Sequence, residues 1–320
     1  MTDVNVTPEV SVCICTYNRA RQLRDVLGDL VSQACPPERF EVIVVDNNSS
    51  DETASVVEQL AGGFPSLRYS FEEIQGLAHA RNRGWREARG RYVGYLDDDC
   101  RVAHDWVEGA LRVAGDVALA AFGGPYFARF DSPPPTWFLP AYGSHVQGET
   151  ARDLGPGEYL DGANFFVRRD LLEALGGFDG ELGMRGGALG YGEETDLLRR
   201  LRAEVREARI RYEPDLRVEH VVAPRKLHLR WVAWDRFARG RADFHVFAVQ
   251  PPGTLGLATG LTRVLSQLSW NVVRGCLGRD RTRHPHLKSF LYEQGLAPLH
   301  ELGQLVEGAS VRLGRSSRAS

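Results

Sequence analysis

Four short runs of β-branched and aromatic residues alternate with helix-like segments in the first hundred residues. The runs are EVSVCIC, FEVIVV, LRYSF and RYVGYL, and the helix-like segments cover residues 19–33, 51–61 and 76–89. Short apolar runs separated by helices are typical of buried parallel strands. The pattern predicts a doubly wound α/β sheet, whose ligands bind beyond the carboxyl ends of the strands. Ser49 and Glu52 have capping-box spacing, which predicts the start of the second helix.

The alternation of strand-like and helix-like segments changes twice further along the chain. This suggests three parts: residues 1–100, residues 101–224 and a mostly helical part at residues 225–320. The middle part contains FARFDSPPPTWFLPAYG, which is rich in Pro and aromatic residues, and the glycine-rich GALGYG. We expect the loops at 125–145 and 183–192 to act as hinged lids. The helix after the second loop should present Leu197, Leu198 and Leu201 to the core.

Charge is distributed unevenly. From residue 221 onward there are 15 Lys and Arg against 6 Asp and Glu, a net charge of +9. Because the whole chain has a net charge of −3, the first 220 residues have a net charge of −12. A basic tail on an acidic body suggests an anionic partner such as a membrane surface, and a solvated helical face is the alternative. Apolar residues recur in the tail at helical spacing and could face a membrane, the core or a second copy in a homodimer: Leu257, Leu261, Val264, Leu268 and Val272.

Nothing in the sequence indicates export or a membrane span. The first ten residues lack the pattern of a signal peptide, and Arg263 and Arg274 interrupt the longest apolar stretch. The five cysteines form no CxxC pair, as expected in a reducing compartment. We expect a cytoplasmic protein, either free or peripheral to the inner face of the plasma membrane, with no nucleic-acid partner.

Three consecutive acids, Asp97, Asp98 and Asp99, follow the fourth apolar run, and Asp46 follows the second. Both positions are carboxyl ends of predicted strands, so the acids should share one edge of the sheet. Adjacent carboxylates repel one another without a cation and can hold Mg²⁺ with one. A turn with spare acids is the alternative for the triplet. Asp46 could bind a ribose or a base, or could serve as a turn residue.

Other candidates lie on predicted helices and on one strand. Arg81 and Asn82 stand one turn into a glycine-led helix and could meet a phosphate, although helix arginines are also commonly solvated. Glu193 and Glu194 begin a helix, where acids favour the helix dipole, and either could act as a general base. His220 ends a strand-like run and could complete a metal site begun by Asp99, or be structural.

Taken in order, several motifs resemble the family 2 glycosyltransferases of GT-A fold over residues 10 to about 222. They are VSVCICTYNRARQLRDVLGDLVSQ, FEVIVVDNNSSDET, QGLAHARNRG, GYLDDDC, GANFFVRRDLL…GGFD and GYGEETDLLRRL. The resemblance is greatest to bacterial transferases that build surface polysaccharide or exopolysaccharide. It implies a mixed GT-A sheet with a nucleotide-binding half (1–100), an acceptor-binding half (101–224) and a helical basic extension.

The resemblance also implies a role for each matching residue. The nucleotide sugar would be bound by Thr16, Tyr17, Arg19, Asp46, Arg81, Asn82, Asp97 and Asp98. Asp97 would lie near the ribose, while Asp99, with His220, would hold Mn²⁺ or Mg²⁺. The acceptor would meet Gly162, Ala163, Asn164 and Glu193. Glu194 would be the catalytic base, but relatives carry the shorter Asp there, so Asp196 is a rival.

The sequence therefore predicts an inverting, metal-dependent glycosyltransferase of polysaccharide biosynthesis. Its donor would be a nucleotide-diphosphate sugar, most commonly a UDP sugar in the family, and its acceptor a glycan, a lipid-linked glycan or a small molecule. One alternative is a catalytically idle nucleotide-sugar-binding or assembly protein. A sugar nucleotidyltransferase is another, but the first loop, CTYNRARQ, lacks the glycines that such an enzyme uses to bind phosphate.

Overall fold

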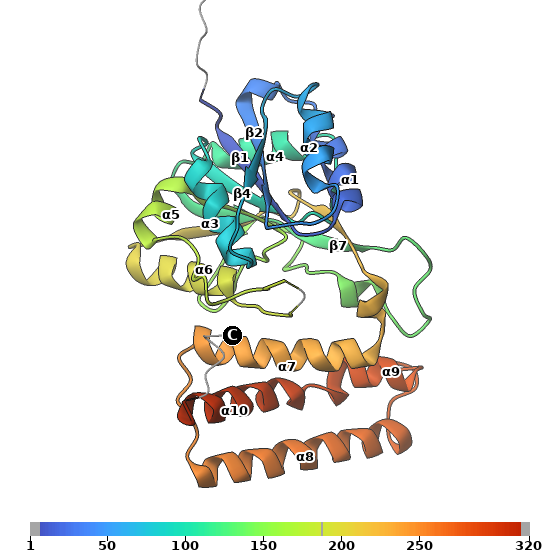
Figure 1. Ribbon diagram of the computed structural model, residues 1–320. Coiled ribbons are helices and arrows are strands. Elements are labelled where there is room, and N and C mark those ends of the chain that lie inside the picture. The colour runs from blue at the N-terminus through green and yellow to red at the C-terminus, as the bar shows by residue number, and fades with distance from the viewer. Residues whose placement is uncertain (1–6, 187, 315–320) are drawn as a thin grey trace, which may run out of the picture. The chain divides into compact units, whose positions relative to one another are not determined.

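The computed structural model describes residues 7–186 and 188–314 (Figure 1). The chain separates into two compact units. The first, the sheet unit, extends to Arg129 and also includes Pro140–Gly180 and Glu193–Val221. The second, the helical unit, comprises Phe130–Leu139, Glu181–Gly192 and the residues from Val222 onward. The three-part division predicted at residues 100 and 224 stays a prediction.

An eight-stranded mixed sheet forms the centre of the sheet unit, in the order β3-β2-β1-β4-β9-β6-β10-β8. Its strands are β1 (Val10–Thr16), β2 (Phe40–Asp46), β3 (Leu67–Phe71), β4 (Tyr92–Leu96), β6 (Leu119–Gly123), β8 (Arg152–Asp153), β9 (Asn164–Arg168) and β10 (Arg209–Tyr212). The first four are parallel, as predicted, whereas β9 runs antiparallel to both β4 and β6. Parallel pairing places Thr16 beside Asp46, and the carboxyl ends of β1, β2 and β4 therefore lie at the same edge of the sheet.

A second, three-stranded sheet contains β5 (Cys100–Val102), β11 (Val218–Val221) and β7 (Tyr126–Arg129), with β11 in the middle. Its first strand begins at the residue that follows the three aspartates. His220 of β11 pairs with Cys100 in an antiparallel ladder. This pairing brings a histidine from late in the sequence to the end of β4.

Helices cover both faces of the large sheet, which confirms the doubly wound prediction. They are α1 (Ala20–Val31), α2 (Thr53–Ala61), α3 (Leu77–Glu87), α4 (Trp106–Ala114), α5 (Arg169–Leu175) and α6 (Glu193–Glu204). Buried residues of α1, α2 and α4 share one hydrophobic core, and those of α3, α5 and α6 share the other. Successive residues of β1 alternate between these cores, because side chains of a strand point to opposite faces. Leu197, Leu198 and Leu201 are fully buried, as expected.

The start of α2 differs from the prediction. No side-chain cap forms at Glu52, so the predicted capping box is wrong. The Ser49 hydroxyl instead accepts a hydrogen bond from the backbone N–H of Asn18 in the preceding loop, at 2.9 Å. At the start of the helix, the Asp51 carboxylate accepts a hydrogen bond from the backbone N–H of Thr53 at 3.1 Å. A tertiary contact thus replaced a local one.

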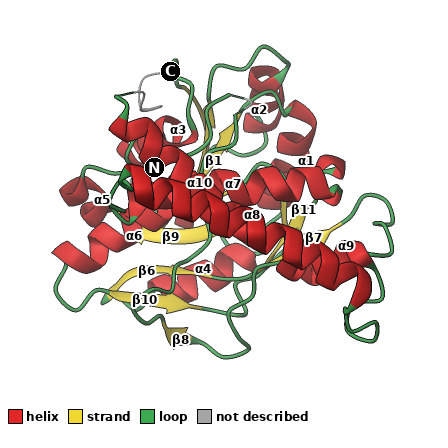
Figure 2. Ribbon diagram, turned by 90° about the horizontal axis from the view of Figure 1, so that it is seen from below, coloured by secondary structure: helices red, strands yellow, loops and turns green. Residues whose placement is uncertain are grey.

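The helical unit contains α7 (Leu229–Val246), α8 (Thr254–Leu277), α9 (Leu287–Phe290) and α10 (Pro298–Arg312). Short 3₁₀ turns occupy Pro37–Arg39, Pro140–Gly143 and Pro224–Leu227, and a π-helical turn occupies Leu291–Gly295. Within the helical unit, α10 lies between α7 and α8, and α8 crosses in front of both in Figure 2. Over the residues that the structure describes, no helix has the length and hydropathy needed to cross a membrane.

Candidate active site

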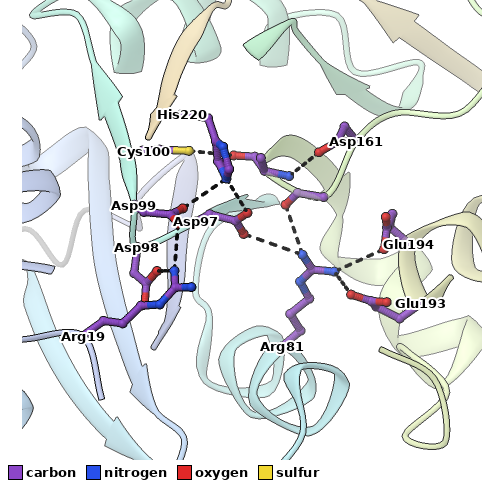
Figure 3. A network of polar contacts seen from close by, with 12 residues as sticks. Arg19, Arg81, Asp97, Asp98, Asp99, Cys100, Asp161, Glu193, Glu194 and His220 are labelled. Carbon is purple, nitrogen blue, oxygen red and sulfur yellow. Dashed lines mark hydrogen bonds and ion pairs between the residues drawn. The ribbon is translucent and has the colours of Figure 1, made fainter. Parts of the chain in front are cut away.

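Asp97 and Asp99 meet His220 at the carboxyl end of β4 (Figure 3). The Nε2 atom of His220 lies 3.2 Å from a carboxylate oxygen of Asp99 and 3.9 Å from one of Asp97. One ligand atom from each of the three residues lies within 4.8 Å of the others. The structure therefore brings together Asp99 and His220, the two residues that the sequence paired.

Asp98 points away from this cluster. Its buried carboxylate accepts hydrogen bonds from the Thr16 hydroxyl at 2.8 Å and from the Arg19 guanidinium at 2.7 Å. The same guanidinium nitrogen lies 2.8 Å from Asp99. Burial raises the pKa of Asp98 to about 7, although Arg19 opposes that rise. Asp98 thus fastens β1 and the following loop to the end of β4.

The donor set of the Asp97, Asp99 and His220 cluster suits a divalent cation. Carboxylate oxygens are preferred by both Mg²⁺ and Mn²⁺, and an imidazole nitrogen is more usual for transition metals. Burial raises the pKa of Asp97, and the neighbouring charge of Asp99 raises it further. A cation between these acids would relieve the repulsion that raises this pKa. The residues present therefore fit the ion that the sequence predicts.

Arg81 of α3 connects this cluster with the acids at the start of α6. Its side chain is only 3% exposed. One guanidinium nitrogen is 4.0 Å from Asp97, and another donates to Glu193 at 3.0 Å and lies 3.6 Å from Glu194. The backbone carbonyl of Gly162 accepts a further hydrogen bond from Arg81 at 3.1 Å. Figure 3 shows Asp97 and Glu194 on two sides of this guanidinium.

Glu194 and Asp196, the two candidates for the base, lie in different surroundings. Burial raises the pKa of Glu194 to about 8, with a further contribution from Glu193, while Arg81 lowers it. Asp196 is held by Arg199 at 3.2 Å and by Arg200 at 2.7 Å on its own helix. Glu194 therefore shares the Arg81 network, whereas the carboxylate of Asp196 is paired with two arginines.

One buried oxygen of Glu193 has no hydrogen-bond partner among the residues that the structure describes. Its other oxygen accepts from Arg81. A buried acceptor without a donor is costly, so a donor such as a hydroxyl would be favoured at this position. The sequence predicted Glu193 as an acceptor-binding residue, and that role stays a prediction.

Other predicted site residues have bonds to protein groups. Asp46 accepts from the Tyr69 hydroxyl at 2.9 Å and from the backbone N–H of Ser49 at 2.8 Å. The Asn82 side chain accepts from the backbone N–H of Phe178 and donates to its carbonyl, both at 2.8 Å. These two bonds join α3 to the loop after α5. Nucleotide contacts by Asp46 and Asn82 stay predictions.

The remaining residues of the predicted acceptor and nucleotide sites differ in exposure. Asn164 is fully buried and donates to backbone carbonyls of Leu216 and Pro125, at 2.5 and 3.4 Å, and Ala163 is also buried. A side chain at Gly162 would place its Cβ 2.7 Å from Arg81, so the glycine allows the guanidinium to approach the backbone. Tyr17 is half-buried at the end of β1.

Sequence reasoning missed the surroundings of Arg81. Its guanidinium carbon lies 5.5 to 5.7 Å from the ring centres of Tyr95, Phe165 and Phe178. It also missed Asp161, whose charge raises the pKa of both Asp97 and Glu194. Asp161 directly precedes Gly162, so its place beside a predicted site residue was the available signal.

Parts of both predicted lids belong to the helical unit. In the first, Trp137 and Phe138 pack on Tyr292, with ring centres 6.4 and 6.0 Å apart. In the second, the Tyr191 hydroxyl donates to Asp235 of α7, and Arg239 lies 4.2 Å above the Tyr191 ring. Segments 130–139 and 181–192 are thus anchored to helices of the C-terminal region.

The sequence profile of Glycosyl transferase family 2 matches residues 11–176, about half of the chain. The chain belongs to glycosyltransferase family 2. This is the family that the sequence predicted. The match includes Asp46, Arg81 and the three aspartates, while His220 and the acids of α6 lie beyond it.

Two curated relatives are similar to this member of family 2. Glycosyltransferase AglE of Haloferax volcanii is 30% identical over 176 residues, which cover 55% of this chain and 57% of AglE. Succinoglycan biosynthesis protein ExoM of Rhizobium meliloti is 28% identical over 254 residues, which cover 78% of each chain. The chain thus spans little more than half of AglE but over three quarters of ExoM.

Solved structures confirm the predicted GT-A fold. Mannosyltransferase PcManGT from Pyrobaculum calidifontis, in complex with GDP-Man and Mn²⁺, matches with a TM-score of 0.56 and 21% identity, covering 95% of this chain and 75% of its own. S. aureus TarS 1-349, in complex with UDP-GlcNAc, matches with a TM-score of 0.55 and 17% identity, covering 96% and 92%. At these identities the likeness concerns the fold alone.

Proposed function

We propose that this family 2 glycosyltransferase moves a sugar from a nucleotide-diphosphate sugar to an acceptor hydroxyl, inverts the anomeric configuration, and depends on Mn²⁺ or Mg²⁺. The observation that carries the proposal is the position of Arg81. Its buried guanidinium lies within 4.0 Å of Asp97 on one side and of Glu194 on the other. A candidate cation-binding cluster and a candidate base are therefore close enough to act on one substrate.

Asp99 and His220 would hold the divalent cation, as the sequence suggested, and we add Asp97 as the third ligand because of its place in the same cluster. When bound, the ion would stabilise the negative charge that develops on the departing diphosphate. Thr16, Tyr17, Arg19 and Asp46 would bind the nucleotide from the ends of β1 and β2. We assign Asp98 and Asn82 positioning roles, because their side chains already join elements of the sheet unit.

Glu194 would act as the base. The acceptor oxygen attacks the anomeric carbon while its proton passes to Glu194, and the bond between that carbon and the diphosphate oxygen breaks with its electron pair on the diphosphate. A pKa near 8 makes an ionised Glu194 a stronger base than an ordinary carboxylate. Attack opposite to the leaving group in a single displacement inverts the configuration. The buried, unpartnered oxygen of Glu193 would accept a hydrogen bond from the acceptor.

The names of relatives and neighbours support the substrate classes. PcManGT was solved with GDP-Man and Mn²⁺, TarS with UDP-GlcNAc, and ExoM is named for succinoglycan biosynthesis. We propose a nucleotide sugar as donor, with UDP as the first base to test. We propose a glycan or lipid-linked glycan acceptor in the synthesis of a bacterial polysaccharide.

The test combines donor binding with transfer. In Asp99→Ala we expect Mn²⁺-dependent binding of the nucleotide sugar, measured by calorimetry, to be lost together with transfer. In Glu194→Ala we expect donor binding to persist while the transfer rate falls about 10²- to 10⁴-fold, the usual contribution of a general base. Glu204→Ala, at the exposed far end of the same helix, is the matched control and should behave as wild type.

Three outcomes would contradict parts of the proposal. Full turnover in excess chelator would exclude the metal requirement. Asp196 would be the base if Asp196→Ala lost transfer while its donor binding and folding stayed intact, and if Glu194→Ala remained active. Tight donor binding without hydrolysis or transfer across a panel of acceptors would indicate a binding protein in place of an enzyme.

A further inference from the structure

Helix α8 of the helical unit has one packed face and one open face. On the packed face, Gly260, Val264 and Gly275 are buried. A Cβ at Gly260 would come 2.9 Å from Leu305 of α10, so these two helices are in close contact. Leu257, Leu261 and Leu268 are half-buried, whereas Val272 is exposed. The apolar stripe noted in the sequence is therefore mostly internal packing.

The open face carries a second apolar set, of which the spacing analysis identified only Val272. Six large apolar side chains are 47 to 85% exposed: Leu255, Leu265, Trp270, Val272, Val273 and Leu277. The helix has 24 residues, so at 1.5 Å per residue the face extends for about 36 Å. Apolar side chains gathered along one helix mark an interaction surface, whereas single exposed ones need no explanation.

No acidic residue occurs between residues 254 and 279. The charged groups of α8 are Arg263 and Arg274. Arg263 is paired with Glu301 of α10, and Arg274 donates to the Gln294 side chain, so both guanidinium groups are directed to neighbouring helices. The open face is thus uncharged, with Ser, Thr and Gln as its polar residues.

A basic segment follows the helix directly. Arg281, Arg283 and Lys288 are exposed, and Arg279 is half-buried. The one acid among them, Asp280, accepts backbone hydrogen bonds from Thr282 and Arg283 at 2.8 and 3.2 Å. An apolar face therefore ends beside a cluster of positive charge.

We propose that the open face of α8 and the basic segment 279–288 dock on an anionic lipid surface. An amphipathic helix binds in the plane of a membrane through its apolar face, and adjacent Lys and Arg add attraction to anionic headgroups. Trp270 suits the boundary between headgroups and acyl chains. A second copy of the chain fits less well, because α8 offers no acid to pair with the basic segment of its partner. Docking of this kind lies along the membrane and needs no membrane-spanning helix.

Vesicle flotation of the full chain tests the proposal. We expect wild type to float with phosphatidylcholine vesicles that contain phosphatidylglycerol, and to bind vesicles of phosphatidylcholine alone more weakly. Leu265→Glu combined with Val272→Glu should weaken binding more than tenfold, because charge enters the apolar face. Val117→Glu, which changes a side chain that is 59% exposed in the sheet unit, is the matched control and should bind as wild type.

Arg281→Gln provides a second arm, with an expected loss of about fivefold in affinity for the anionic vesicles, the usual contribution of one basic residue near such a surface. This change leaves the apolar face intact, so it measures the contribution of positive charge to vesicle binding separately from that of apolar burial. Unfolding curves of all variants should match that of wild type, because every substituted side chain is exposed.

Two results would overturn the proposal. One is wild type that remains unbound to anionic vesicles. The other is a concentration-dependent dimer that the double variant abolishes while vesicle binding is unchanged, because the open face would then bind a second copy. The assay contains neither donor nor acceptor, so its outcome is independent of the proposed transfer reaction.

Discussion

Replacing Arg81 with Met should destabilise the sheet unit far more than the loss of an ordinary arginine. The guanidinium is 3% exposed, and it pairs with Glu193, whose side chain is 5% exposed. Burial alone lowers the pKa of Arg81, but Glu193 and Glu194 raise it above its ordinary value, so the arginine stays charged. Met has a similar length and can pack near the rings that surround the site. The substitution removes the positive charge that lies beside Glu193 and Glu194.

The magnitude follows from this burial. Breaking a buried ion pair by removing one partner costs about 3 to 5 kcal/mol. The sheet unit has roughly 200 residues, and an unfolding entropy of about 2.1 cal/mol/K per residue gives about 0.4 kcal/mol/K. The expected fall in Tm is therefore about 7 to 12 °C. The loss should shrink at low pH, because protonation removes the unpaired charges.

Arg83→Met, on the same helix, is the matched control. Arg83 also forms an ion pair, with Glu87 at 2.6 Å, but its side chain is 47% exposed. An exposed pair of this type contributes about 0.2 to 1 kcal/mol. Thermal unfolding followed by circular dichroism would measure the Tm of both variants. In the double variant Arg81→Met with Glu193→Gln, part of the loss should be recovered. Equal destabilisation by Arg81→Met and Arg83→Met would refute the reasoning.

Three further predictions concern single side chains. Burial raises the pKa of folded Glu194 from 4.5 to about 8, so between these values the folded state binds a proton that the unfolded chain has released, and the free energy of unfolding falls as pH rises. Glu194→Gln should therefore match wild type near pH 4 and be about 4 to 5 kcal/mol more stable near pH 9 by urea unfolding. Equal stability of the two proteins at both pH values would contradict the raised pKa. A Cβ at Gly94 would clash with the buried Phe166 ring, so Gly94→Ala should cost about 1 to 3 kcal/mol, which an unchanged Tm would contradict. Mn²⁺ alone should raise the Tm of wild type but not of Asp99→Asn, with Glu204→Gln as the control.

The sequence by itself determined the sheet and the place of its acids. Short β-branched runs and helical periodicity are local properties, and they predicted β1 to β4 and α1 to α3 within two residues at each end. Parallel strands share one carboxyl edge, so Asp46 and Asp97 could be placed together without coordinates. The capping box failed because Ser49 bonds to Asn18 in another loop, a contact that no local pattern encodes.

Tertiary structure alone decided which of the neighbouring residues face one another. Arg81 and Glu193 are 112 positions apart, and only the folding of the sheet unit brings their charges to 3.0 Å. Arg19 bonds to both Asp98 and Asp99, whereas His220 meets only Asp97 and Asp99 of the three acids. Three consecutive aspartates in the sequence could not reveal this difference. In α8 the spacing indicated one apolar stripe, but packing on α10 buried most of it and left another apolar face exposed. Periodicity describes a single segment, whereas burial and pairing depend on what the rest of the chain places beside it.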